Sequence, residues 1–216
     1  MHESVQKLVH IEKVVKSKEI DSKKITIIAV SKTFGLDKIM PLVEYGHLHY
    51  GENKVQEALD KWTGIKEKKP ELKLHLVGKL QTNKVKFALK IFDFIHSVDN
   101  EKLAKKIADE EIKQNKKVKI FLQVNIGNED QKSGVAKNDL SNLFLYCKSL
   151  NLDVIGLMCL PPANTDPVPF FQELNKMNQN LSLSELSMGM SSDYSKAIEN
   201  FSTFIRVGSS IFGERN

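Results

Sequence analysis

The sequence predicts an α/β fold, a (β/α)8 barrel built as one domain over residues 1–216. Short apolar runs alternate with longer charged stretches of helical period, and the alternation repeats eight times. The runs recur about every 25 residues, which favours a closed barrel over an open doubly wound sheet. They are also nearly continuously apolar, which indicates parallel strands covered by helices. An open α/β sheet remains the alternative, because it would show the same alternation.

The predicted elements can be placed along the chain in order. Strands are expected at residues 25–32, 47–53, 72–78, 92–99, 119–127, 153–161, 183–191 and 204–213. Helices are expected at residues 37–45, 53–65, 83–91, 100–114, 137–150, 167–179 and 193–201. The stretch 100–114 shows the helical pattern, because its apolar residues fall on one face: Leu103, Ala104, Ile107, Ala108 and Ile112.

The eighth helix of such a barrel is missing from its usual place, because the sequence ends at Asn216, directly after the eighth strand. The N-terminal segment is amphipathic, with Val5, Leu8, Val9 and Val15 on its apolar side. We expect this N-terminal helix to replace the missing last one.

The composition is that of a soluble protein, with 41% hydrophobic and 27% charged residues. No apolar run approaches the roughly 20 residues of a membrane helix, and the charged N-terminal stretch has no signal core. We therefore expect a cytoplasmic monomer with no membrane partner. Cys147 and Cys159 lack metal or redox spacing and are expected to be buried thiols.

The formal net charge of +5 does not indicate nucleic-acid binding, because the lysines are spread over many predicted helix faces with few aromatic residues between them. The arginines are more informative. Of 32 basic residues only Arg206 and Arg215 are arginine, and Arg206 lies inside an apolar strand. That position is expected to require a planar, permanently charged guanidinium.

The carboxyl ends of the seventh and eighth strands carry a candidate phosphate site, where barrels commonly hold a phosphate. Ser191 follows the seventh strand, with Gly189 allowing close backbone approach, and Gly208 and Ser209 lie after the core of the eighth. Each loop alone is typical of a plain turn. Their pairing on neighbouring strands is what favours phosphate binding.

Lys32 stands at the end of the first strand, at the barrel mouth. A lysine there, with a phosphate site nearby, suits a Schiff base with a phosphorylated aldehyde, and burial would lower its pKa. Alone it would be explained as a rim lysine reaching solvent. Arg206 shifts the balance, because its guanidinium could reach the ring nitrogen of pyridoxal phosphate.

The histidines allow a third interpretation, metal-dependent hydrolysis, because His47 and His49 form an H-x-H pattern. They precede the end of the second strand, however, so we expect core or rim residues, as for His75. His96 is expected near the mouth beside Asp99, with a structural hydrogen bond as its simplest role and a place in the pocket as the alternative. No metal site is predicted.

Eight segments of the chain also resemble the pyridoxal-phosphate homeostasis proteins, single-domain barrels similar to the N-terminal barrel of alanine racemase. The matching segments run in order from about residue 25 to the end: AVSKT (29–33), YGENKVQE (50–57), HLVGKLQTNK (75–84), IHSVD (95–99), QVNIGNEDQKSG (123–134), GLMCLPP (156–162), LSMGMSSD (186–193) and RVGSSIFGER (206–215).

The resemblance implies pyridoxal 5'-phosphate (PLP) as cofactor and a role for each candidate residue. Lys32 would form the Schiff base and Arg206 would meet the pyridine nitrogen. The phosphate would lie at Ser191, Gly208 and Ser209, and Asn53 is implied as a further pocket residue. Two departures from the family pattern, Phe34 with Gly35 and Cys159, are not expected to touch these contacts.

The resemblance further implies a protein that holds PLP and buffers or delivers it, with PLP-dependent apo-enzymes as possible partners. A racemase-type enzyme acting on small amino acids, or a Schiff-base aldolase, is the alternative. A racemase needs a second acid or base on the far face of the cofactor. In the related racemases an extra domain supplies it, whereas this sequence ends at the barrel and offers only Tyr50 or Tyr194 as substitutes. We therefore favour carriage over catalysis.

Overall fold

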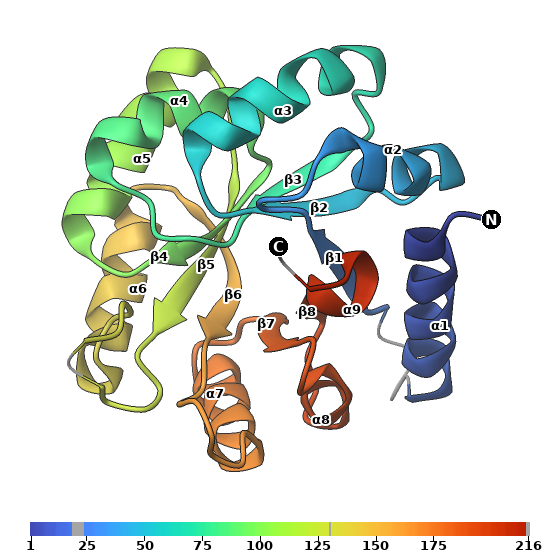
Figure 1. Ribbon diagram of the computed structural model, residues 1–216. Helices are drawn as coiled ribbons and strands as arrows, with labels where there is room; N and C mark the ends of the chain where they lie inside the picture. Colours follow the sequence, from blue (N-terminus) through green and yellow to red (C-terminus); the bar gives the residue numbers. More distant parts are fainter. Residues whose placement is uncertain (19–23, 130, 215–216) are drawn as a thin grey trace.

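The computed structural model describes residues 1–18, 24–129 and 131–214, and in them eight parallel strands form a closed barrel (Figure 1). The strands pair in chain order, and β8 closes the barrel against β1. Their bounds are β1 (Thr26–Val30), β2 (His49–Glu52), β3 (Lys73–Leu76), β4 (Phe94–Val98), β5 (Lys119–Val124), β6 (Asp153–Cys159), β7 (Glu185–Met190) and β8 (Phe204–Val207). The predicted barrel is confirmed, and the open sheet is wrong.

The helices cover the outside of the barrel (Figure 1). Their bounds are α1 (Glu3–Lys18), α2 (Leu36–Tyr45), α3 (Val55–Lys68), α4 (Val85–Ile91), α5 (Glu101–Gln114), α6 (Leu140–Ser149), α7 (Val168–Asn180), α8 (Tyr194–Glu199) and α9 (Ser209–Phe212). Two short 3-10 turns, η1 (Thr82–Lys84) and η2 (Lys137–Asp139), lead into α4 and α6.

Helix α1 takes the place of the helix that would follow β8. It contacts α2 on one side and α8 and α9 on the other. Its buried face comprises Val5, Leu8, Ile11 and Val15, which join the core between helices and sheet. The predicted substitution by the N-terminal helix is therefore confirmed.

Alternate residues of each strand serve two separate cores. Ile27 and Ala29 pack outward against the helices, whereas Ile28 and Val30 belong to an interior cluster. The other buried members of that cluster are Phe94, Phe121, Met158 and Phe204. Arg206, two residues beyond Phe204, falls on the interior face by the same alternation.

All eight predicted strands extend further than the observed ones, and the difference matters most for β1 and β8. β1 ends at Val30, and Thr33 then adopts φ 68°, a left-handed conformation that a strand cannot continue through. The predicted strand 204–213 is instead β8 followed by α9, which begins at Ser209. Lys32 therefore lies in the turn after its strand.

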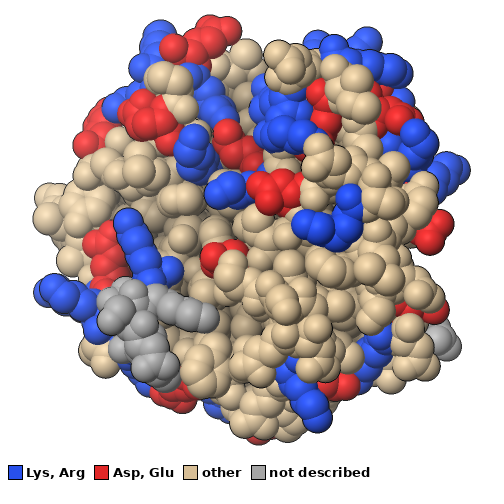
Figure 2. All heavy atoms as spheres, turned by 180° about the vertical axis from the view of Figure 1, so that it is seen from behind, with Lys and Arg blue, Asp and Glu red and all other residues tan. Residues whose placement is uncertain are grey.

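Charged residues are mixed on the molecular surface. On the face opposite to that of Figure 1, lysines and acidic residues intersperse, most densely over the upper part of the view (Figure 2). None of the helices within the described ranges is long and apolar enough to cross a bilayer. Cys147 and Cys159 are buried, and burial raises the pKa of each thiol to about 12. Arg215 lies outside the described residues.

Candidate functional site

A cavity of about 390 Å³ opens at the carboxyl ends of the strands. Two of the predicted residues, Lys32 and Asn53, line it. The remaining lining residues are Val77, Gly78, Lys79, Gln123, Val124, Asn125, Gln131, Lys132, Ser133 and Leu160. The other predicted residues, Ser191, Arg206, Gly208 and Ser209, lie at β7 and β8 and are not among this lining.

Ser191 ties the two predicted phosphate loops together. Its Oγ accepts hydrogen bonds from the backbone N–H of Gly208 at 3.2 Å and of Ser210 at 3.4 Å. Gly208 lies against β1, because a Cβ there would stand 3.3 Å from the carbonyl oxygen of Val30. The two loops thus meet next to the strand that leads to Lys32.

Gly189 allows a close approach within this chain. Its φ is +91°, and a Cβ there would lie 2.5 Å from the Cβ of Ala197 and 3.0 Å from the Cα of Tyr194. The glycine therefore allows β7 to pack against α8. The close approach is to a helix of this chain.

Arg206 is a buried cation, with 5% of its surface exposed. Its Nη1 donates to Ser187 Oγ at 2.6 Å and its Nη2 to the carbonyl of Cys159 at 2.9 Å. No carboxylate of the described residues forms an ion pair with it, and burial lowers the pKa of its guanidinium. The contact at Cys159 is made by its backbone carbonyl, so it does not depend on the cysteine side chain.

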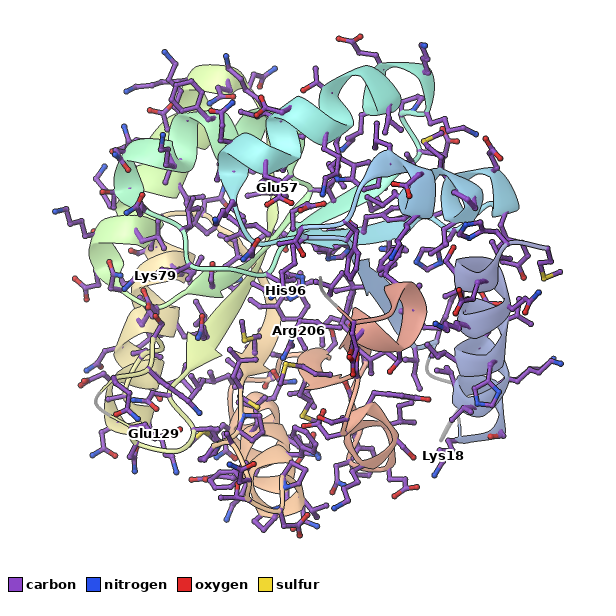
Figure 3. All side chains as sticks on the ribbon, in the orientation of Figure 1. Lys18, Glu57, Lys79, His96, Glu129 and Arg206 are labelled. Carbon is purple, nitrogen blue, oxygen red and sulfur yellow. The ribbon has the colours of Figure 1, made fainter. Side chains whose placement is uncertain are left out.

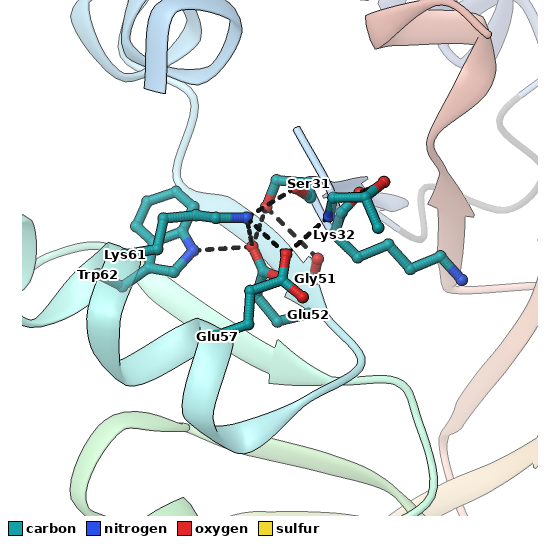
Figure 4. A network of polar contacts seen from close by, with 8 residues as sticks. Ser31, Lys32, Gly51, Glu52, Glu57, Lys61 and Trp62 are labelled. Carbon is teal, nitrogen blue, oxygen red and sulfur yellow. Dashed lines mark hydrogen bonds and ion pairs between the residues drawn. The ribbon is translucent and has the colours of Figure 1, made fainter. Parts of the chain in front are cut away.

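The segment on either side of Lys32 is fixed by a network of charged residues from β2 and α3 (Figure 4). Ser31 donates through Oγ to the fully buried carboxylate of Glu52 at 2.7 Å. The same oxygen, Oε1, accepts from Trp62 Nε1 at 2.9 Å and from Lys61 Nζ at 3.0 Å. Glu52 thereby links the turn after β1 to α3.

The second half of this network holds Thr33. Its backbone N–H donates to Glu57 Oε1 at 2.7 Å, and Lys61 Nζ bridges Glu57 at 3.1 Å and the carbonyl of Ser31 at 3.0 Å. Burial disfavours the charged form of Glu57, but the Thr33 N–H and Lys61 lower its pKa overall. Lys32 is half-buried, and its side chain extends away from these residues (Figure 4). We call Glu52, Glu57 and Lys61 the ionic clamp.

Asn53 offers a hydrogen-bond acceptor at the cavity. Its Oδ1 is buried and has no hydrogen-bond partner within the described chain. Gly78 fixes the position of Asn53, because a Cβ on Gly78 would clash with the carbonyl oxygen of Asn53 at 2.4 Å. A bound molecule with a donor group would satisfy the Asn53 oxygen.

The two tyrosines considered as substitute acids pack on the outer core between sheet and helices. Tyr50 is buried in the outer core against Trp62, with ring centroids 4.6 Å apart, and burial raises its pKa. Tyr194 packs on the same outer core. Neither lines the cavity that contains Lys32.

His75 is fully buried and His47 and His49 are half-buried, in keeping with the core or rim positions expected for them, whereas His96 lies deeper than expected. It lies in the barrel interior near Arg206 (Figure 3) and bonds to His75 and Ser187 rather than to Asp99. In the part of the chain that the structure describes, no three His, Cys, Asp or Glu side chains are placed to hold a metal ion.

Sequence reasoning missed the ionic clamp and the bonds between histidines. The signal for the clamp was Glu52, an acid predicted at the end of a buried strand, which requires a partner. For the histidines, the signal was three of them on successive apolar strands.

Comparison with known proteins first defines the class. A family model described as "Alanine racemase, N-terminal domain" matches residues 10–216. An alanine racemase of Clostridium difficile shares the fold, with a TM-score of 0.73 at 12% identity over 94% of this chain and 55% of the racemase. The molecule is therefore a barrel of the alanine racemase N-terminal class.

The chain belongs to the pyridoxal phosphate homeostasis protein family. A protein of that name from Aquifex aeolicus is 38% identical over 199 residues, covering 88% of this chain and 86% of the relative. PipY of Synechococcus elongatus, solved with PLP bound, is similar with a TM-score of 0.87 and 31% identity over 97% of this chain and 100% of PipY. The resemblance noted in the sequence is confirmed.

Proposed function

We propose that this protein binds PLP, holds it as a Schiff base on Lys32, and buffers or delivers it within the cell. The observation that carries the proposal is a pair of basic residues at adjoining strands. Lys32 follows β1 and lines the mouth cavity, and Arg206 on β8 is buried without an ion pair to a carboxylate of the described residues. The family and the PLP-bound PipY structure support it.

The residues present fit the cofactor. Arg206 carries a buried positive charge that a ring nitrogen with a free lone pair, or another electron-rich acceptor, would compensate. Asn53 Oδ1 is an orphaned acceptor within the described residues. Ser191 and the loop at Gly208 and Ser209 present hydroxyl and N–H groups next to β1, as a phosphate requires.

Each residue has a separate task in this proposal. When bound, the cofactor supplies an aldehyde that condenses with a primary amine, forming a C=N bond and releasing one water. Lys32 supplies that amine, and the ionic clamp fixes the backbone from which its side chain extends. Arg206 orients the ring, and Ser191, Gly208 and Ser209 hold the phosphate.

The experiment is covalent trapping with site mapping. The protein is loaded with PLP, reduced with borohydride and digested, and the modified peptide is located by mass spectrometry. We expect the label on Lys32, with none there or elsewhere in Lys32→Ala. Lys54→Ala removes an exposed neighbouring lysine outside the cavity lining and should label as the unaltered protein does. Undiminished labelling of Lys32→Ala would sink the assignment.

Delivery is tested by adding an apo form of a PLP-dependent enzyme to the loaded protein. Activity of that enzyme should be restored by the loaded protein, and not by the same protein after borohydride reduction, because reduction makes the bond to Lys32 permanent. Equal restoration by both samples would exclude Lys32 as the donor site.

The proposal describes a single barrel domain over residues 1–216 that works as a cytoplasmic monomer. Light scattering should give the mass of one chain, 24.5 kDa. Urea unfolding should show one cooperative transition. Fractionation of cells should recover the protein with the cytoplasmic contents.

A further inference from the structure

A continuous row of hydrogen bonds crosses the inside of the barrel and ends at Arg206. His49 Nδ1 lies 2.9 Å from His75 Nε2, and His75 Nδ1 lies 2.9 Å from His96 Nε2. His96 Nδ1 lies 2.8 Å from Ser187 Oγ, which accepts from Arg206 Nη1 at 2.6 Å. We call His49, His75, His96 and Ser187 the histidine chain.

His49, His75 and His96 occupy regularly spaced positions on the neighbouring strands β2, β3 and β4. His49 pairs with Lys73 in the strand register, and His75 lies two residues further along β3. His75 pairs in turn with Phe94, and His96 lies two residues further along β4. Each step therefore moves one strand around the barrel and two residues towards the mouth, which is the stagger that a closed barrel imposes.

The rings are held in fixed planes by stacking. His75 stacks on Phe94 with centroids 4.2 Å apart and planes 14° apart, and His96 stacks on Phe121 at 4.3 Å and 19°. Both histidines are fully buried. Rotation of either ring would break two hydrogen bonds inside a packed core, so the histidine chain is a rigid element.

Arg206 determines which partner donates in every hydrogen bond of the histidine chain. A guanidinium can only donate, so Ser187 Oγ accepts from Arg206. Among the described residues the only other partner of that hydroxyl is His96 Nδ1, so the serine proton goes there. His96 must then carry its own proton on Nε2.

The same donor-to-acceptor order holds for the next two rings, because each ring is neutral and carries one N–H. Burial lowers the pKa of His75 and His96 well below the usual value, and that of His49 to about 4. His96 Nε2–H donates to His75 Nδ1, and His75 Nε2–H donates to His49 Nδ1. All three are Nε2–H tautomers, and His49 lines a cavity of about 500 Å³ at the amino-terminal ends of β1 and β2.

We propose that His49, His75, His96 and Ser187 are positioning residues for Arg206, a neutral one-way chain of hydrogen bonds that holds a buried guanidinium without a carboxylate. Each donor in the row makes the next acceptor stronger, so Ser187 Oγ accepts more strongly than an isolated hydroxyl. A carboxylate would neutralise Arg206, whereas the histidine chain leaves its positive charge for a ligand. The inference that the charge serves a ligand rests on the proposed PLP site. The order of donors and acceptors in the histidine chain does not depend on that site.

The direct test is nitrogen-15 NMR of the full chain without added PLP, above pH 7. We expect Nε2–H tautomers for all three histidines and a nitrogen–nitrogen coupling across both His–His hydrogen bonds. An Nδ1–H tautomer in any of the three, or no coupling between His75 and His96, would overturn the proposal. A failure of PLP binding would leave this result untouched, so the two proposals fail separately.

Variants test whether the histidine chain positions Arg206 or only fills space. His75→Leu should abolish the resolved Nη–H signals of Arg206, whereas His75→Gln, which keeps one acceptor and one donor, should retain them. His47→Leu is the control, because this half-buried histidine donates to the backbone carbonyl of His49 and takes no part in the side-chain hydrogen bonds of the histidine chain. Unchanged Arg206 signals in His75→Leu would show a merely structural role. If His75→Leu does not fold, the tautomers of the unaltered protein decide.

Discussion

Lys32 and Arg206 lie at adjoining strands, yet the protein holds them in opposite ways. Around Lys32 the backbone is fixed, from outside the barrel, by the charged residues Glu52, Glu57 and Lys61. At Arg206 the side chain itself is fixed, from inside the barrel, by neutral groups. The difference matches the two proposed tasks, because a residue that forms a bond must move its side chain and a residue that presents a charge must not.

Removal of Glu52 should have the largest effect on stability. Glu52→Ala leaves Lys61, the Trp62 N–H and the Ser31 hydroxyl without their shared acceptor, which should cost about 3–5 kcal/mol. Glu52→Gln keeps an acceptor and should cost less. Urea unfolding of both variants measures the difference. Exposed ion pairs contribute less than about 1 kcal/mol. If Glu52→Ala lowers the unfolding free energy by no more than that, the ionic clamp does not stabilise the fold.

Acid should weaken the histidine region before the ionic clamp. Burial lowers the pKa of His47 and His49 to about 4, so stability is fully present above the unfolded value near 6.5 and is lost as pH falls towards 4. At pH 4, protonation of each histidine should therefore lower the free energy of unfolding by up to about 3 kcal/mol. The pKa of Glu57 is lowered, so its contribution disappears only as pH falls below the usual carboxyl range.

Urea unfolding at several pH values tests that order. The slope of unfolding free energy against pH gives the number of protons taken up on unfolding. Between pH 6.5 and 4 that number should be smaller by about one in His49→Gln than in the unaltered protein. An unchanged slope would mean that His49 is protonated in the folded protein.

Arg206 should contribute to ligand binding far more than to stability. Arg206→Met removes a buried charge that forms no ion pair with a carboxylate of the described residues, so the unfolding free energy should change by less than about 2 kcal/mol. Loss of a charge-assisted contact should raise the Kd for PLP by about 10-fold to 100-fold. Absorbance titration with PLP measures the Kd. Equal affinity in both proteins would remove Arg206 from the site.

Glu57 should have a smaller effect on stability and a specific one on Lys32. Glu57→Gln weakens the acceptor of the Thr33 N–H, which should cost about 1 kcal/mol. The rate of borohydride-trappable labelling should fall, because the turn that carries Lys32 is less well fixed. A rate equal to that of the unaltered protein would separate the ionic clamp from Lys32.

Tyr50→Phe should have the smallest effect. The hydroxyl of Tyr50 is buried and has no hydrogen-bond partner in the described ranges, so its removal leaves no group newly unsatisfied. The unfolding free energy should stay within about 0.5 kcal/mol, or rise. PLP labelling should not change. A clear loss in either measurement would place this tyrosine in a contact outside those described.

The fold followed from the sequence because strand and helix periods are local patterns. The apolar run at 25–30 and the stripe from Leu103 to Ile112 each indicate an element from neighbouring residues alone. The ends of elements depended on the turn chemistry of single residues, such as Thr33 with its positive φ. That is why every strand was predicted too long, β1 and β8 among them.

The candidate site was predictable only in part, for a related reason. Lys32 and Arg206 stood out because a charged residue in or directly after an apolar strand is unusual. The partners of each residue depend on the register between strands, which places His75 next to His96 across 21 positions. Register follows from closure of the whole barrel, so no local pattern revealed the histidine chain or the ionic clamp.

The central claim is that Lys32 and Arg206 act on one ligand, and a crystal structure of the PLP-loaded protein tests it most directly. We predict electron density continuous with Lys32 Nζ, the ring nitrogen within hydrogen-bond distance of Arg206, and the phosphate among Ser191, Gly208 and Ser209. PLP bound to another lysine, or a ring that does not contact Arg206, would contradict the claim.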